Sequence, residues 1–154
     1  MSNLPSTAAN RRVTPYLIVQ GAIAALEFYA SAFGARELVR LDDGNGKIMH
    51  AELDIADARI MLADEFPDMG YRGPQSLGGS SVSLHLYVDD VDSVFARAVA
   101  LGATATMAVA DQFDGDRRGT LTDPFGHVWL LASRKEDVSY EEMRARFAKM
   151  MGQA

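Results

Sequence analysis

Residues 14–35 have the sequence TPYLIVQGAIAALEFYASAFGA, and residues 83–103 repeat its pattern as SLHLYVDDVDSVFARAVALGA. In both stretches an apolar run of strand length leads into a helical pattern that ends at a glycine followed by alanine. Further along, ARIMLAD (58–64) aligns with GHVWLLA (126–132). A repeat of roughly 65–70 residues is too long for a solenoid and too short for two ordinary domains. We therefore predict two halves of one domain that face each other across a shared cleft.

Composition is that of an ordinary globular domain, with 154 residues, 48% of them hydrophobic and 23% charged. Cysteine is absent, which excludes disulfides, thiolate metal sites and cysteine nucleophiles and fits the cytoplasmic localisation that we expect. A net charge of −6 argues against a nucleic-acid partner, because phosphate binding needs clustered cations. Apolar runs are too short for a membrane span, so no membrane partner is expected. Residues 1–12 lack the apolar core of a signal peptide and are predicted to be a flexible tail.

The first module is predicted to span residues 13–64 with the order β-α-β-β-β. A strand at 13–20 precedes a helix that ends at Gly34, and strands at 36–41, 47–55 and 59–63 follow. The apolar residues expected to form the buried face of this helix are Ile23, Leu26, Ala30 and Phe33.

The second module is predicted to span residues 81–135 in the same order, after a linker at 65–80 rich in Gly, Pro and Ser. Its helix is capped by Asp90 and has an expected inward face of Val91, Val94, Phe95, Ala98 and Leu101. Strands are predicted near 104–110, 117–122 and 127–132. A capping box at 139–142 opens a further helix in the segment 136–154, whose apolar stripe indicates a docking or subunit contact: Met143, Phe147, Met150 and Met151. The fold class is thus α+β, with paired βαβββ modules in one domain (13–135) and a C-terminal helix.

Several motifs accompany this repeat, among them EFYASAFGA (27–35), MHAELDI (49–55), SLHLYVDDVD (83–92), DPFGHVW (123–129) and EDVSYEEM (136–143). Together they resemble the vicinal oxygen chelate superfamily, and within it the PhnB-like branch of the glyoxalase/bleomycin resistance protein family. The resemblance extends from about residue 13 to 143. Members of this branch usually carry aromatic residues where this chain has Asp114 and Arg118, which implies a more polar or more anionic ligand here.

The resemblance also implies where a catalytic metal would be held. Four strand positions supply His or Glu in the metal-dependent members, and the internal repeat assigns them to Thr14, Leu62, Ser83 and Leu130. Leucine offers no donor atom, and neutral hydroxyls bind divalent ions weakly without carboxylates beside them. We therefore expect no metal and no other cofactor, which argues against glyoxalase I and extradiol dioxygenase chemistry.

A metal site displaced from those positions is an alternative. Strand parity places His50 and Glu52 on one face of the strand 47–55, opposite Ala51 and Leu53. The same parity places Ser83, His85 and Tyr87 on one face of the strand 82–88. If both faces line the cleft, His50, Glu52 and His85 form a chemically sufficient ligand set. The other possibilities are a metal-free polar pocket and exposed or dimer-facing positions.

Arg118 lies 68 residues after His50, so the two are expected at equivalent strand positions of the two modules. An arginine in a cleft suits a carboxylate or phosphate ligand. The alternative is that Asp114, Asp116 or Glu52 neutralises it. His127, in the turn before the last strand, is expected to hydrogen-bond that turn or the preceding loop rather than to act in catalysis.

The main functional hypothesis is a homodimeric protein that binds a small molecule in a metal-free cleft. The residues predicted to line that cleft are Tyr16, His50, Glu52, Ser83, His85, Tyr87 and Arg118. The alternative is a lyase or isomerase in which His85 or Glu52 is the general base and Arg118 stabilises an enolate, with or without a displaced metal. A third possibility is a regulatory dimer with a vestigial cleft. The sequence does not decide whether the protein is an enzyme.

Overall fold

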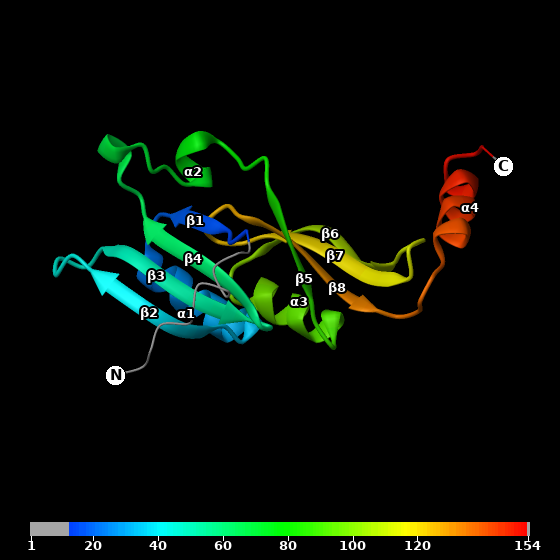
Figure 1. The fold of residues 1–154 in the computed structure, drawn as a ribbon, viewed down its shortest axis with the longest axis horizontal. Coiled ribbons are helices and arrows are strands. Elements are labelled where there is room, and N and C mark those ends of the chain that lie inside the picture. Colours follow the sequence, from blue (N-terminus) through cyan, green and yellow to red (C-terminus); the bar gives the residue numbers. More distant parts are fainter. Residues whose placement is uncertain (1–12, 154) are drawn as a thin grey trace.

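The computed structural model describes residues 13–153, and the predicted tail at 1–12 lies outside that range. The predicted order β-α-β-β-β appears twice (Figure 1). The first module contains β1 (Tyr16–Val19), α1 (Ala22–Phe33), β2 (Arg36–Asp42), β3 (Ile48–Ile55) and β4 (Ala58–Asp64). The second contains β5 (Ser83–Tyr87), α3 (Val91–Ala100), β6 (Thr104–Asp111), β7 (Asp116–Thr122) and β8 (Val128–Arg134). The α+β prediction is confirmed.

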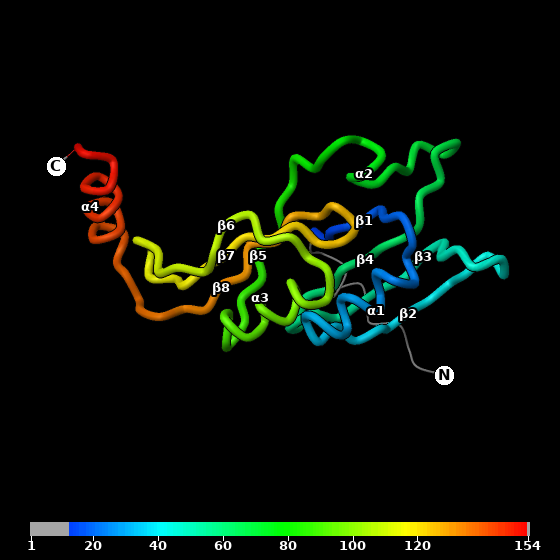
Figure 2. The backbone as a smooth tube through the Cα atoms, turned by 180° about the vertical axis from the view of Figure 1, so that it is seen from behind, coloured from blue at the N-terminus to red at the C-terminus, as the bar shows by residue number. Residues whose placement is uncertain are grey.

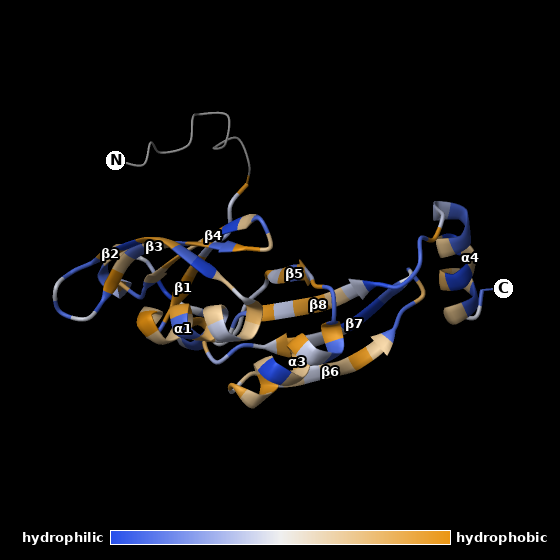
Figure 3. Cartoon of the chain, turned by 90° about the horizontal axis from the view of Figure 1, so that it is seen from below, coloured by the Kyte–Doolittle hydropathy of each residue, from blue (hydrophilic) through white to orange (hydrophobic). Residues whose placement is uncertain are grey.

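Each module forms its own four-stranded sheet, in the order β1-β4-β3-β2 and β5-β8-β7-β6. The first strand of each sheet is parallel to the last, and the remaining neighbours are antiparallel. Helix α1 contacts its own sheet and also α3, which packs on the second sheet. The two modules are therefore joined through their helices, with the sheets side by side along an elongated molecule (Figures 2 and 3).

Helix α1 begins and ends at glycines with positive φ, Gly21 (88°) and Gly34 (69°), a conformation that costs glycine little. Gly21 has no side chain to cap the helix, so Asp64 at the end of β4 accepts hydrogen bonds from the backbone amides of Gly21 (3.0 Å) and Ala22 (2.9 Å). In the second module Ser133 occupies the equivalent position and accepts from the backbone amide of Val91 (2.9 Å). The last strand of each module thus fixes the start of its helix.

The predicted buried face of α1 is partly wrong. Leu26 and Phe33 are buried, but Ala30 is exposed and Ile23 is 40% exposed. The buried side chains form a wider stripe because α1 packs against α3 as well as its own sheet: Ala22, Ala25, Leu26, Phe28, Tyr29, Ala32 and Phe33. In α3 the predicted face is right for Val91, Phe95 and Ala98, whereas Leu101, at the C-cap, is exposed.

The segment 65–80, predicted as a linker, contains two short elements, the 3₁₀ helix η1 (Pro67–Met69) and the helix α2 (Pro74–Leu77). Helix α2 packs on β1. At the other end of the molecule, α4 (Tyr140–Met150) extends from the second module (Figure 1). The Ser139 hydroxyl caps α4 as predicted, by accepting from the backbone amide of Glu142 (3.2 Å), yet no residue of α4 is buried. Within residues 13–153, no helix is long and apolar enough to span a membrane.

Candidate functional site

The face of the first sheet opposite α1 carries a hydrogen-bonded chain of polar side chains. The Tyr16 hydroxyl lies 2.9 Å from Nδ1 of His50, and Nε2 of His50 lies 3.2 Å from Oε1 of Glu52. Because a carboxylate only accepts, Nε2 of His50 donates to Glu52 and Nδ1 accepts from Tyr16. Arg59 on β4 donates from Nη1 to Oε2 of Glu52 (2.6 Å). We call Tyr16, His50, Glu52 and Arg59 the first-sheet cluster.

The open face of the second sheet carries a denser set of charges around Asp116, which is 2% exposed. The Tyr87 hydroxyl donates to its Oδ2 (2.8 Å), and Arg118 donates from Nη1 to Asp114 (2.9 Å) and, at 3.4 Å, to Oδ2 of Asp116. Nε of Arg134 lies 3.0 Å from Oδ1 of Asp116, an ion pair without hydrogen-bond geometry, so Oδ1 is buried with no hydrogen-bond partner. The second-sheet cluster is His85, Tyr87, Asp114, Asp116, Arg118 and Arg134.

Within the second-sheet cluster the ionisable groups influence one another. Burial and then the positive charge of Arg118 lower the pKa of His85, which keeps its imidazole neutral at pH 7. The hydrogen bond to Asp116 raises the pKa of Tyr87. The ring centroids of His85 and Tyr87 lie 4.7 Å apart, so the neutral imidazole and the protonated phenol form one continuous surface.

Replacing Arg118 with methionine is expected to raise the pKa of His85, because the substitution removes the more influential of two nearby positive charges, with Arg134 remaining, while the negative charges of Asp114 and Asp116 stay in place. Titration of the imidazole C–H resonances by nuclear magnetic resonance measures this pKa directly. Arg36→Met, at an exposed ion pair on β2, is the control and should leave the pKa of His85 unchanged. An unchanged or lower pKa in Arg118→Met would show that Arg118 does not act on His85.

The seven residues predicted to line one cleft are thus divided between two sheets. Tyr16, His50 and Glu52 belong to the first-sheet cluster, and His85, Tyr87 and Arg118 to the second-sheet cluster. Ser83 is exposed on β5. Because α1 and α3 join the modules through the helix-covered faces, the open faces of one chain do not close on each other. The prediction of a cleft formed within the chain is corrected accordingly.

The prediction missed Arg59, Arg134 and the central role of Asp116. Asp116 is two residues before Arg118 on β7, as His50 is two before Glu52 on β3, so strand parity could have placed Asp116 on the open face. Of the two alternatives for Arg118, neutralisation is the one observed, by Asp114 and Asp116 rather than Glu52.

Strand register corrects one of the four positions at which the resemblance implied a metal ligand. Tyr16 pairs with Met61 in the first sheet, and His85 pairs with Leu130 in the second. Met61, not Leu62, is therefore equivalent to Leu130, while Leu62 is 0% exposed beneath α1.

The four positions become Thr14, Met61, Ser83 and Leu130, and this donor set does not fit a divalent metal that requires imidazole and carboxylate ligands. Residues 13–153 contain no group of three or more His, Asp or Glu placed to hold a metal, so His85 does not join His50 and Glu52 within one chain.

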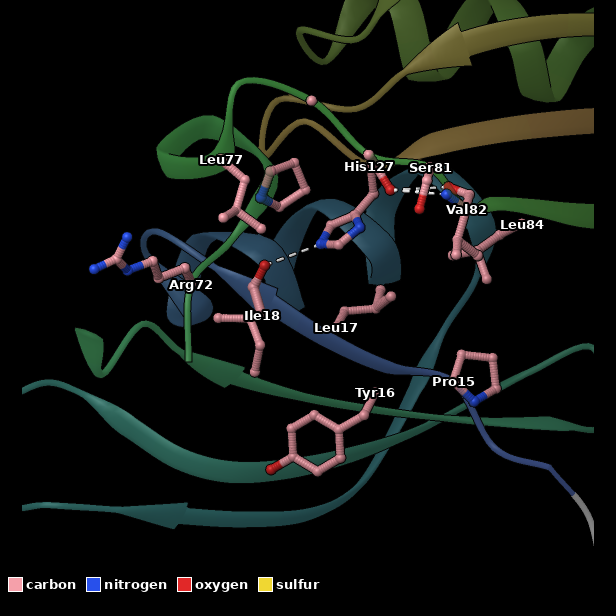
Figure 4. A pocket seen from close by; sticks show the side chains of 13 residues that line it. Pro15, Tyr16, Leu17, Ile18, Arg72, Leu77, Ser81, Val82, Leu84 and His127 are labelled. Carbon is pink, nitrogen blue, oxygen red and sulfur yellow. Dashed lines mark hydrogen bonds between the residues drawn. The ribbon is translucent and has the colours of Figure 1, made fainter. Parts of the chain in front are cut away.

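A pocket of roughly 600 Å³ lies between β1, β5 and the segment 72–82 (Figure 4). Of the seven predicted residues only Tyr16 lines it. His127 also lines it, and its Nε2 donates to the carbonyl oxygen of Ile18 on β1 (3.0 Å), not to its own turn or the preceding loop as predicted. The turn before β8 therefore lies against the first module.

A family model described as the Glyoxalase/Bleomycin resistance protein/Dioxygenase superfamily matches residues 11–131. The chain belongs to this superfamily.

Relatives within the superfamily agree with the resemblance to PhnB-like proteins. The uncharacterized protein Mb0911c of Mycobacterium bovis is 44% identical over 136 residues, which cover 86% of this chain and 90% of that protein. The solved structure of the At5g48480 product of Arabidopsis thaliana is 29% identical, with a TM-score of 0.65 over 79% of this chain and 97% of its own. The PhnB protein of Bacillus cereus, 22% identical, has a TM-score of 0.62 over 80% of this chain and 99% of its own and shares the fold.

Proposed function

We propose that this superfamily member is a homodimer that binds a small polar molecule in two clefts without a metal. Each cleft would be formed by the first-sheet cluster of one chain and the second-sheet cluster of its partner. The observation that carries the proposal is that each chain exposes two polar sheet faces that cannot meet each other because α1 packs on α3. A second copy related by a two-fold axis is the simplest way to cover both faces.

The chemistry of the two clusters supports a ligand with both donors and acceptors. The charge of Arg118 is balanced by Asp114 and Asp116 through its Nη1, which leaves its other N–H groups and the neutral His85 to donate to a carbonyl or carboxylate oxygen, while the second lone pairs of the Glu52 oxygens can accept. Binding of this kind requires complementarity and no reaction. The absence of cysteine is compatible with action in the cytoplasm, where we place the protein.

Helix α4 gives separate support for a dimer, because its contacts with the second module are few: the ring centroids of Phe147 and Phe113 lie 5.4 Å apart, and Arg146 donates to the carbonyl oxygen of Phe113 (3.5 Å). It has eleven residues, none buried, and Phe147, Met150 and Met151 are all exposed. A helix of that length is marginal in water on its own, and a further surface packed on its exposed apolar side chains would stabilise it. We place this stripe in contact with the second chain.

Cross-linking tests the shared cleft without knowledge of the ligand. The chain has no cysteine, so Glu52→Cys and His85→Cys introduce single thiols. We expect a short bis-maleimide to link the two variants when they are mixed and allowed to exchange, because one thiol from each chain would lie in the same cleft. Arg36→Cys, mixed with His85→Cys, is the control and should not be linked.

Two results would contradict the shared cleft. One is a monomer in sedimentation velocity at micromolar concentration. The other is a cross-linking yield for Glu52→Cys with His85→Cys no greater than for the Arg36→Cys control. The metal-free part of the proposal is tested separately by mass spectrometry of protein purified without chelators. Stoichiometric zinc, nickel, manganese or iron that is lost in His50→Ala or His85→Ala would overturn it.

A lyase or isomerase is the second candidate, favoured by the lowered pKa of His85. A neutral imidazole beside Arg118 is suited to remove a proton while the guanidinium stabilises the enolate. Glu52 is the weaker base candidate, since Arg59 and His50 already occupy its two oxygens. His85→Ala separates the candidates: an enzyme would lose turnover and keep binding, whereas a binding protein would show no turnover in either form.

A further inference from the structure

The pocket beside β1 shares only Tyr16 with the two clusters. Its walls are mainly apolar and include Leu17, Ile18, Pro74, Leu77 and Leu84. Tyr16 borders it, but the Tyr16 hydroxyl is engaged with His50. Arg72 also borders it, and its side chain points away from the other labelled residues (Figure 4). The volume of roughly 600 Å³ lies within the range of small-molecule sites.

The cover of the pocket is held in place by close backbone contacts. A Cβ on Gly73 would lie 2.7 Å from the carbonyl oxygen of Ile18, and a Cβ on Gly126 would lie 2.8 Å from Cβ of Pro74. The side chain of Gln75 donates to the carbonyl oxygen of Pro124 (3.0 Å), and Gln20 donates to Ser76 (2.8 Å). The segment 73–77 is thus fixed both to the first module and to the turn before β8, and the pocket is preformed.

The hydrogen bond of His127 selects one tautomer of its imidazole. Since the carbonyl oxygen of Ile18 can only accept, Nε2 of His127 carries a proton, and in the neutral form of the ring Nδ1 is an acceptor. The hydrogen bond to Ile18 uses Nε2 only, and Nδ1 forms none with residues 13–153. Figure 4 shows the imidazole between Ile18 and the strand that carries Leu84. The pocket therefore has mainly apolar walls, with the imidazole of His127 among the polar groups at its lining.

We propose that this pocket is a second binding site, for a small neutral aromatic molecule that carries a hydroxyl group. The aromatic body would lie against Leu17, Leu77 and Leu84, and the hydroxyl would donate to Nδ1 of His127. This site goes beyond the proposed function, because it uses neither the charged clusters nor a partner chain.

Two probes that differ only in the hydroxyl donor test the proposal. 2-Naphthol can donate to His127, and 2-methoxynaphthalene has the same ring system but no donor. Equilibrium dialysis with fluorescence detection should show saturable binding of one molecule per chain, with 2-naphthol bound roughly 2- to 10-fold more tightly, the effect of one net hydrogen bond. His127→Phe should abolish that preference and leave 2-methoxynaphthalene binding unchanged.

A matched pair of surface variants keeps the proposal falsifiable if His127→Phe does not fold. Leu77→Asp places a charge in the apolar wall and should abolish binding of both probes, while Leu101→Asp, on an exposed position of the second module, should not. His50→Ala and His85→Ala should bind both probes normally, which separates this site from the sheet faces. The absence of saturable binding to the unmodified protein, or binding that survives Leu77→Asp, would overturn the proposal, as would a preference for 2-naphthol that persists in His127→Phe.

Discussion

Replacing Asp123 with alanine is expected to lower the free energy of unfolding by roughly 3–5 kcal/mol, because it leaves several buried donors without an acceptor. The carboxylate is 4% exposed. It accepts from the hydroxyl of Tyr29 (2.6 Å) and from Nε1 of Trp129 (2.9 Å). It also accepts from the backbone amides of Phe125 and His127, both at 2.9 Å. Since Tyr29 belongs to α1, this one side chain connects the first module to the turn before β8.

Urea denaturation measures the loss, with Asp89→Ala as the control. Asp89 is exposed and forms no hydrogen bond within the described chain, so its replacement should change the free energy of unfolding by less than about 0.5 kcal/mol. Asp123→Asn should also destabilise, since its amide nitrogen cannot accept from Tyr29 or Trp129. If Asp123→Ala unfolds at the same urea concentration as Asp89→Ala, the carboxylate does not hold the modules together.

The fold could be predicted because its signals are local and appear twice. Apolar strands, Gly34 and Gly102 after the helices and the cap at Asp90 each specify a boundary within a few residues of where they lie. The inward face of α1 was less predictable, since the burial of Tyr29 depends on residues more than 90 positions away in the sequence: its ring lies against Phe125 and Trp129, and its hydroxyl donates to Asp123. The helical periodicity of apolar residues predicts that one face is buried. It does not predict how many other elements pack on the helix, and therefore not how wide the buried face is.

Strand parity predicted which polar residues share a face within one strand, but not how the two sheets lie relative to each other. Parity correctly joined His50 to Glu52 on one open face, because both lie on β3. It could not decide how the two sheets are oriented, so His85 was assigned to the same cleft. The sequence does not signal the burial of Asp123, since an aspartate followed by proline and glycine is typical of a turn whether or not its carboxylate is buried.

Leu62→Glu and Met61→Glu are expected to differ sharply, although the residues are neighbours on β4. Leu62 is fully buried, and a carboxylate there has neither water nor a partner, so we expect a loss of at least about 4 kcal/mol or failure to fold. Met61 is half-buried, paired with Tyr16 on the open face, and its replacement should cost less than about 1 kcal/mol. Thermal and urea denaturation of the two variants measure the difference.

This comparison decides which residue of β4 can present a ligand atom to the open face. If Met61→Glu folds and Leu62→Glu does not, the register Tyr16–Met61 and His85–Leu130 holds in solution, and the position equivalent to Leu130 is a methionine. The thioether of Met61 and the alkyl group of Leu130 then occupy positions where the metal-dependent members of the superfamily have His or Glu. Neither group is a ligand for a hard divalent ion. The opposite outcome, a folded Leu62→Glu beside an unfolded Met61→Glu, would restore the register in which Leu62 is equivalent to Leu130 and would place the polar residues of β3 on the helix-covered face.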